Sequence, residues 1–196
     1  MPAEQHRTAY QNAVVRGRDD VAELLNGLGA STELRPGDRE VAAVARGVRP
    51  ERPLPDVLDH DQEEVVCLAA LEGHLELVVE LLGANFFGHV GGGPPGTLLH
   101  HACWVGNSAI VARLLELGAD PVAKSGAKFD TPVAWCALGS QWHRAAGRDY
   151  VAVAEQLLTV GAELEARSSR SQRGRWPTGW KRESKADAGR EPFFLH

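Results

Sequence analysis

Residues 97–120 read TLLHHACWVGNSAIVARLLELGAD, and this stretch decides the fold of the 196-residue chain. Residues 64–87, EVVCLAALEGHLELVVELLGANFF, align with it at a shift of 33 residues, with nothing inserted or deleted. The alignment matches Ala69 with Ala102, Gly73 with Gly106, Leu77 with Ile110, Val78 with Val111, and Leu81-Leu82 with Leu114-Leu115. Self-similarity at a fixed period of this length is typical of a repeat protein, in which each repeat is one supersecondary unit.

Further copies flank these two. A later copy spans residues 131–162, with an insertion between its halves, and an earlier copy spans residues 8–30. Between them lies a degenerate copy, DREVAAVARG at residues 38–47. Prolines at positions 50, 53 and 55 prevent a second helix there, because proline lacks the backbone N–H and clashes with the preceding turn. The sequence therefore predicts four recognisable repeats and one degenerate repeat.

Each complete copy predicts two short helices. Thr97 and Thr131 are at predicted N-cap positions. Pro132 takes the first helical position, where the N–H that proline lacks would have no intrahelical partner in any case. The second helices carry their apolar residues on one face, so their Leu pairs, such as Leu24-Leu25, Leu114-Leu115 and Leu157-Leu158, are the predicted core.

Caps and glycines mark the other helix ends. The predicted caps of the second helices are Asp20, Ser108 and Asp149. Glycines in the left-handed conformation are predicted to end both helices. They are Gly17, Gly47, Gly73 and Gly106 after the first helix, and Gly29, Gly118 and Gly161 after the second. In the second copy Asn85 takes the place of this glycine.

A known family shares these features. TLLHHA at 97–102, GNSAIVARLLELGADP at 106–121 and TPV at 131–133 resemble the ankyrin repeat, with its TPLHxA opening and 33-residue period. The chain also resembles bacterial ankyrin-repeat proteins, and the resemblance covers residues 6–166. It implies an all-α fold, an ankyrin-repeat α-solenoid of stacked helix-turn-helix units with hairpin-like connecting loops. We accordingly expect a flexible N-terminus at residues 1–5 and a basic, disordered tail at residues 167–196.

The composition narrows the class of protein. The chain is 43 % hydrophobic, which suffices for a core, and no apolar run approaches the roughly 18 residues of a membrane span. Three cysteines do not make a disulfide framework. Residues 1–7 lack the apolar stretch of a secretion signal, so we expect a cytoplasmic protein.

Function follows from the resemblance, because stacked ankyrin repeats form a concave groove with which the family binds other proteins. It implies a monomeric protein–protein interaction module with no cofactor and no membrane partner. The two positions before the helix-ending glycine tend to face the groove. Here they are Leu71 and Glu72, Trp104 and Val105, and Leu138 with Gly139. An exposed row of Leu71, Trp104 and Leu138 would be apolar, which marks a binding surface unless another segment covers it.

Two loops supply further candidates. The insertion LGSQWHRAAGRDY at 138–150 carries Trp142, and a loop longer than a fold requires either serves function or is a tolerated surface insertion. The turn SGAKFD at 125–130 carries Phe129. The candidate partner-binding residues are thus Leu71, Glu72, Trp104, Val105, Phe129, Leu138 and Trp142.

The histidines and cysteine of the third copy do not form a recognisable metal-binding pattern. His100, His101 and Cys103 are neighbours, but zinc sites usually need four ligands at recognisable spacings, and these are lacking. The resemblance makes His100 the family's structural histidine, hydrogen-bonded to nearby backbone. Cys67 and Cys136 fall on first helices and are interpreted as small hydrophobic residues.

Catalytic motifs are also lacking. The sequence contains neither a phosphate-binding loop nor a nucleophile elbow. The carboxylates of Glu63, Glu64, Glu76 and Glu80 are interpreted as solvated charges on helix surfaces. Without a nucleophile or a paired acid and base, we expect no enzyme.

The tail differs from the repeats in charge. Residues 168–196 hold seven Arg or Lys against three Asp or Glu, a net charge of +4, which leaves −9 on residues 1–167. Trp176 and Trp180 lie among these basic residues. Charge and stacking predict, as the alternative function, a nucleic-acid-associated protein that acts through this tail. The competing interpretation is a disordered extension that folds back on the acidic repeats.

Overall fold

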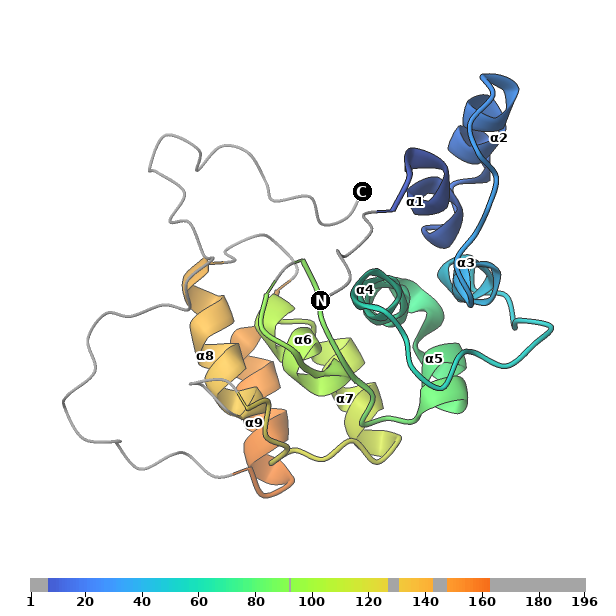
Figure 1. Cartoon of the computed structure of the whole chain (residues 1–196). Helices are drawn as coiled ribbons and strands as arrows, with labels where there is room; N and C mark the ends of the chain where they lie inside the picture. The colour runs from blue at the N-terminus through green and yellow to red at the C-terminus, as the bar shows by residue number, and fades with distance from the viewer. Residues whose placement is uncertain (1–6, 92, 127–130, 143–147, 163–196) are drawn as a thin grey trace, which may run out of the picture. The chain divides into compact units, whose positions relative to one another are not determined.

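Helix pairs follow one another along the chain (Figure 1). The computed structural model describes residues 7–91, 93–126, 131–142 and 148–162, all within the unit Met1–Glu163. The pairs are α1 (Ala9–Val15) with α2 (Asp19–Gly27), α4 (His60–Ala69) with α5 (Leu75–Leu82), α6 (Leu98–Val105) with α7 (Ser108–Glu116), and α8 (Pro132–Trp142) with α9 (Tyr150–Thr159). A kinked π-helical turn, η1 (Ala70–His74), joins α4 to α5. The predicted N-terminus, residues 1–5, and tail, residues 167–196, lie outside the described residues.

The degenerate copy forms one helix, α3 (Asp38–Ala45). No helix follows it until α4, as the prolines at 50, 53 and 55 predict. α3 packs against both α1 and α4, so the row of first helices continues through it. The row of second helices is interrupted at this repeat.

Side-chain caps begin most of the helices. Thr131 accepts a hydrogen bond from the amide of Ala134 at 3.3 Å, and Asp149 accepts one from Ala152 at 2.9 Å, as predicted. The predicted cap Ser108 is wrong by one residue, because the Asn107 side chain accepts from the Ile110 amide at 3.1 Å and α7 starts after it.

The predicted cap Asp20 is also wrong. α2 already begins at Asp19, so Asp20 lies in the first turn of the helix. There its negative charge interacts favourably with the N-terminal end of the helix dipole, and its carboxylate pairs with Arg18 at 3.0 Å.

All seven glycines predicted to end helices have positive φ, from 68° to 121°. The prediction for Asn85 is wrong, because α5 ends at Leu82 and Gly83 takes the positive φ of 86°. The Asn85 side chain connects repeats instead. Its Oδ1 accepts a hydrogen bond from the amide of Asp120, 2.8 Å away.

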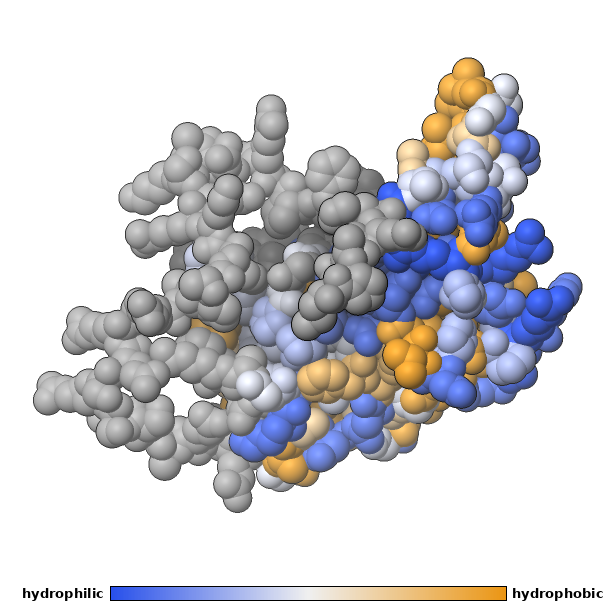
Figure 2. Space-filling view, viewed as in Figure 1, coloured by the Kyte–Doolittle hydropathy of each residue, from blue (hydrophilic) through white to orange (hydrophobic). Residues whose placement is uncertain are grey.

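The core runs continuously along the stack. Its largest fully buried side chains are Leu98, Leu99, Leu114, Leu157, His100, Val15, Val41, Val44, Val66, Val78, Val111 and Val153. The prediction that every Leu pair is core is wrong for Leu24 and Leu158, which are exposed. Leu24 is exposed because the degenerate repeat has no second helix that could pack against α2. Leu158 is exposed because no described helix packs beyond α9. Figure 2 shows the resulting apolar surface at the end of α2.

A short ribbon joins the second and third helix pairs. β1 (Phe87–Gly88) pairs antiparallel with β2 (Gly96–Thr97), with Phe87 opposite Thr97 and Gly88 opposite Gly96. Buried His101 holds the ribbon, because its Nε2 donates a hydrogen bond to the carbonyl oxygen of Gly88 at 3.0 Å.

A buried cation holds the first helices together. The guanidinium of Arg7 pairs with Asp38 and Asp59, each at 2.6 Å, and with Asp61 at 2.9 Å. Burial acts to raise the pKa of Asp59, but hydrogen bonds from Arg7 and from the Gln62 amide outweigh it and lower the pKa. Arg7 therefore ties the start of α1 to α3 and to the start of α4.

Among the described residues, no helix combines the length and the apolar composition needed to cross a bilayer.

Candidate functional site

Trp104 lies at the end of α6, half-buried and held by its neighbours. Its ring meets the buried ring of Trp135 edge to face, with centroids 6.1 Å apart. Its carbonyl oxygen accepts a hydrogen bond from the hydroxyl of Tyr150 at 2.9 Å. Burial raises the pKa of this phenol, so it keeps its proton and remains a donor at neutral pH. Trp104 is thus a well-positioned, partly exposed aromatic residue.

α8 packs against α6 more extensively than any other described pair of elements. The close approach depends on Gly139, because a Cβ there would overlap the carbonyl oxygen of Trp104 and stand 2.8 Å from its carbonyl carbon. The predicted insertion at 138–150 is therefore wrong as a loop in its first part. Gly139 lies inside the helix and permits this packing, and α8 continues to Trp142.

Two apolar candidates share one face of α8. Leu138 is half-buried and Trp142 is 47 % exposed, and a spacing of four residues places them one above the other on the helix. Trp142 ends the helix instead of forming a loop tip.

The other candidates are distributed over the stack. Val105 is half-buried beside Trp104, and its carbonyl oxygen accepts from the Arg148 guanidinium at 3.1 Å. Leu71 is half-buried and Glu72 is exposed, and both lie in η1 of the preceding helix pair. Phe129 lies outside the described residues. The structure thus groups Trp104, Val105, Leu138 and Trp142 on two adjacent helices, with Leu71 and Glu72 one pair away.

His100 has the structural role that the resemblance implies. Its Nδ1 accepts a hydrogen bond from the Thr97 amide at 3.2 Å and lies 2.8 Å from the Thr97 hydroxyl, which closes a capping box at the start of α6.

The three cysteines are buried, as expected of small hydrophobic residues. Burial raises the pKa of Cys67, places that of Cys103 well above its usual range and raises that of Cys136 to about 11. All three are therefore neutral thiols at neutral pH, which makes them poor nucleophiles.

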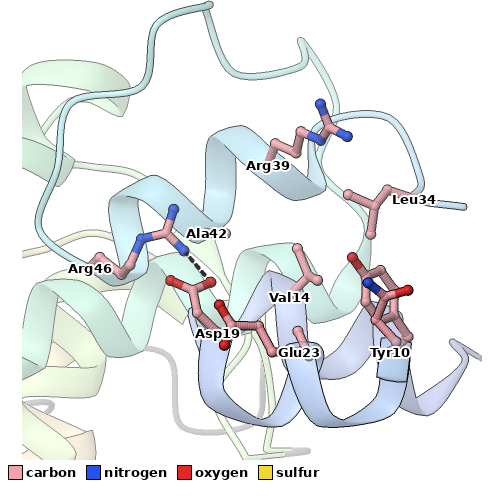
Figure 3. A pocket seen from close by; sticks show the side chains of 10 residues that line it. Tyr10, Val14, Asp19, Glu23, Leu34, Arg39, Ala42 and Arg46 are labelled. Atoms are coloured by element: carbon pink, nitrogen blue, oxygen red, sulfur yellow. Dashed lines mark hydrogen bonds and ion pairs between the residues drawn. The ribbon is translucent and has the colours of Figure 1, made fainter. Parts of the chain in front are cut away.

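A cleft of about 370 Å³ lies between α1, α2 and α3 (Figure 3). Tyr10, Val14 and Leu34 provide apolar lining, while Arg39 adds a cationic side chain. Arg46 and Asp19, which also line the cleft, form an ion pair at 3.2 Å. The cleft adjoins the only helix of the degenerate repeat, so it is a consequence of the missing second helix.

The sequence interpretation missed a cluster on α4. Glu63 and Glu64 are not solvated charges, since Glu63 lies 2.7 Å from His89 and Glu64 pairs with Arg16 at 2.8 Å. Glu76 and Glu80 do lie exposed, in ion pairs with arginines. The ribbon β1–β2 brings His89 to α4 from 26 residues away, a distance that the local sequence pattern does not predict.

Comparison with known proteins identifies the third helix pair. Residues 97–125, which include Trp104 and Val105, match the family model of the ankyrin repeat. The search of curated proteins gave no match. The helix pairs and this match together define an ankyrin helical stack. Ankyrin repeats typically mediate binding between proteins, and the family is generally non-catalytic.

Proposed function

We propose that this protein is a non-catalytic interaction module that binds a partner protein through the side chains at the ends of α6 and α8. The contact residues would be Trp104, Val105, Leu138 and Trp142. Leu71 and Glu72 would extend the surface over the preceding unit, and Phe129 is kept as a further candidate contact. We also interpret the four helix pairs as ankyrin repeats and α3 as a degenerate fifth.

The observation that carries the proposal is the fixed position of Trp104. Its carbonyl oxygen is hydrogen-bonded to Tyr150, its ring contacts Trp135, and the residue is only partly buried. Binding energy concentrates on tryptophan and other aromatic anchors, and an anchor that is already ordered loses little conformational entropy when it binds.

Neighbouring apolar side chains support the same surface. Leu138 and Trp142 follow on the helix that packs against α6, so the partner would meet three apolar side chains from two helices. An apolar segment of the partner is the chemistry that such a surface recognises.

Affinity capture from native lysate tests the proposal. Wild-type protein is compared with Trp142→Glu, which places a charge on an exposed position, and with Trp104→Glu. Val57→Glu is the matched control, because Val57 is 83 % exposed and lies far along the chain from α6 and α8. Circular dichroism verifies the fold of each variant.

Loss of the same partners from both tryptophan variants, with retention by Val57→Glu, would support the proposal. Trp142→Glu keeps the test informative if Trp104→Glu lowers the melting temperature. Identical partners on all folded variants would refute the proposed surface.

A further inference from the structure

Three side chains of the types that commonly bind metal ions lie close together beside the ribbon. His60 and Glu63 lie three residues apart in the first turn of α4, and His89 follows directly after β1. The His89 Nδ1 is 2.7 Å from the Glu63 Oε2, and the centroids of the two imidazoles are 4.4 Å apart. One ligand atom from each residue lies within 4.8 Å of the other two.

The helix side of this cluster is fixed by a helix cap. The Asp59 side chain accepts from the Gln62 amide at 2.9 Å, and the Gln62 side chain accepts from the Asp59 amide at 3.1 Å. This capping box determines where α4 begins. It therefore sets the directions in which the side chains of His60 and Glu63 leave the first turn of the helix.

The ribbon side is fixed by close packing. A Cβ on Gly88 would stand 3.1 Å from the Cys67 Sγ and 3.2 Å from the Glu63 Cβ, so β1 lies directly on α4. The carbonyl oxygen of Gly88 accepts from buried His101. The packing of Gly88 on α4 and its hydrogen bond from His101 thus hold the neighbouring residue, His89, beside Glu63.

We propose that His60, Glu63 and His89 form a binding site for a divalent ion of the zinc type. Two imidazole nitrogens and one carboxylate oxygen suit zinc, which usually takes four ligands in a tetrahedron. Glu64 is not counted among the ligands, because its carboxylate is engaged by Arg16 and by the Gly91 amide. The fourth position would be taken by water or by a group from a bound molecule.

Binding would change the local contacts. The hydrogen bond between His89 and Glu63 would give way to bonds from both side chains to the ion. The ion would then join β1 to α4 and stabilise the folded chain in proportion to its affinity. This role is independent of the proposed protein-binding surface.

Titration calorimetry of the full chain with zinc chloride tests the site. We expect one ion per chain for the wild type and an affinity at least about tenfold lower for His60→Ala, Glu63→Gln and His89→Ala. Even the loss of a residue that only hydrogen-bonds to a metal ligand lowers the metal affinity by about that factor. Glu80→Gln, an exposed carboxylate on α5, is the control and should bind as the wild type does.

Thermal unfolding gives a second readout. Zinc should raise the melting temperature of the wild type and of Glu80→Gln, and should leave that of His60→Ala unchanged. His60 is exposed, so His60→Ala should fold even if His89→Ala does not. Equal zinc affinity of wild type and His60→Ala, or no zinc binding by the wild type, would overturn the proposal.

Discussion

Gly139 of α8 lies against the backbone of Trp104 of α6, so closely that no side chain fits between them. This contact joins the last helix pair to the third and sets the spacing of the proposed binding surface. It also explains why a glycine occurs inside a helix, where it would otherwise destabilise the structure by about 1 kcal/mol relative to alanine.

Gly139→Ala should therefore destabilise the protein, by about 1–3 kcal/mol or more, because the added methyl group forces α6 and α8 apart. Gly27→Ala is the matched control. It lies at the end of α2 with open space around it, and alanine there should be neutral or slightly stabilising. Urea unfolding measures both, and equal stability of the two variants would exclude the tight contact.

Leu114→Ala should lower the free energy of unfolding by about 2–5 kcal/mol, since Leu114 is completely buried and its truncation leaves a cavity. Leu24→Ala removes the same atoms from a residue that is 64 % exposed, so it should change stability by no more than about 0.5 kcal/mol. Calorimetric melting of both variants is the measurement. Similar losses at the two positions would mean that the stack is packed differently.

Arg7→Met should lower the free energy of unfolding by about 3–5 kcal/mol, because it leaves the buried carboxylate of Asp38 without its cation. Arg18→Met breaks an exposed pair with Asp20, and we expect no measurable change there. Chemical denaturation at neutral pH distinguishes the two. An Arg7→Met variant as stable as the wild type would show that Arg7 does not fasten α1 to α3.

His101 should make the protein sensitive to mild acid. Burial lowers the pKa of its imidazole from 6.5 to about 4, so between these values the unfolded chain binds a proton that the folded chain does not. The stability that depends on this residue is complete above pH 6.5 and is lost as the pH falls towards 4. Urea unfolding at pH 7.5, 6 and 5 measures this slope.

His101→Gln keeps a donor for the Gly88 carbonyl but does not titrate, so its stability should fall less steeply over the same pH range. A slope as steep as that of the wild type would assign the acid sensitivity to other groups.

Local sequence rules predict the helices well because their causes are local. Threonine caps, helix-ending glycines and the prolines after α3 act within a few residues, and the structure agrees at Thr131, Asp149 and the seven glycines. The errors at Ser108, Asp20 and Asn85 are shifts of one or two residues in the position of a helix end. The helical first part of the predicted insertion, by contrast, depends on another repeat, because Gly139 lets α8 pack directly against the backbone of Trp104.

The surface residues were only partly predictable. The phase of the repeat places Trp104 and Leu138 near the ends of adjacent helices, but it gives no account of Tyr150 or Trp135, which hold Trp104 in position. The spacing of His60 and Glu63 is visible in the sequence. Their approach to His89 depends on the register of the ribbon β1–β2, which no single segment encodes.

The central claim is that Trp104 anchors a partner protein, and the affinity of a captured partner for purified variants tests it most directly. Titration calorimetry should give a dissociation constant at least about 30-fold weaker for Trp104→Glu than for the wild type, as for a binding hot spot worth about 2 kcal/mol. Val57→Glu should bind as tightly as the wild type. An unchanged dissociation constant for folded Trp104→Glu would contradict the account.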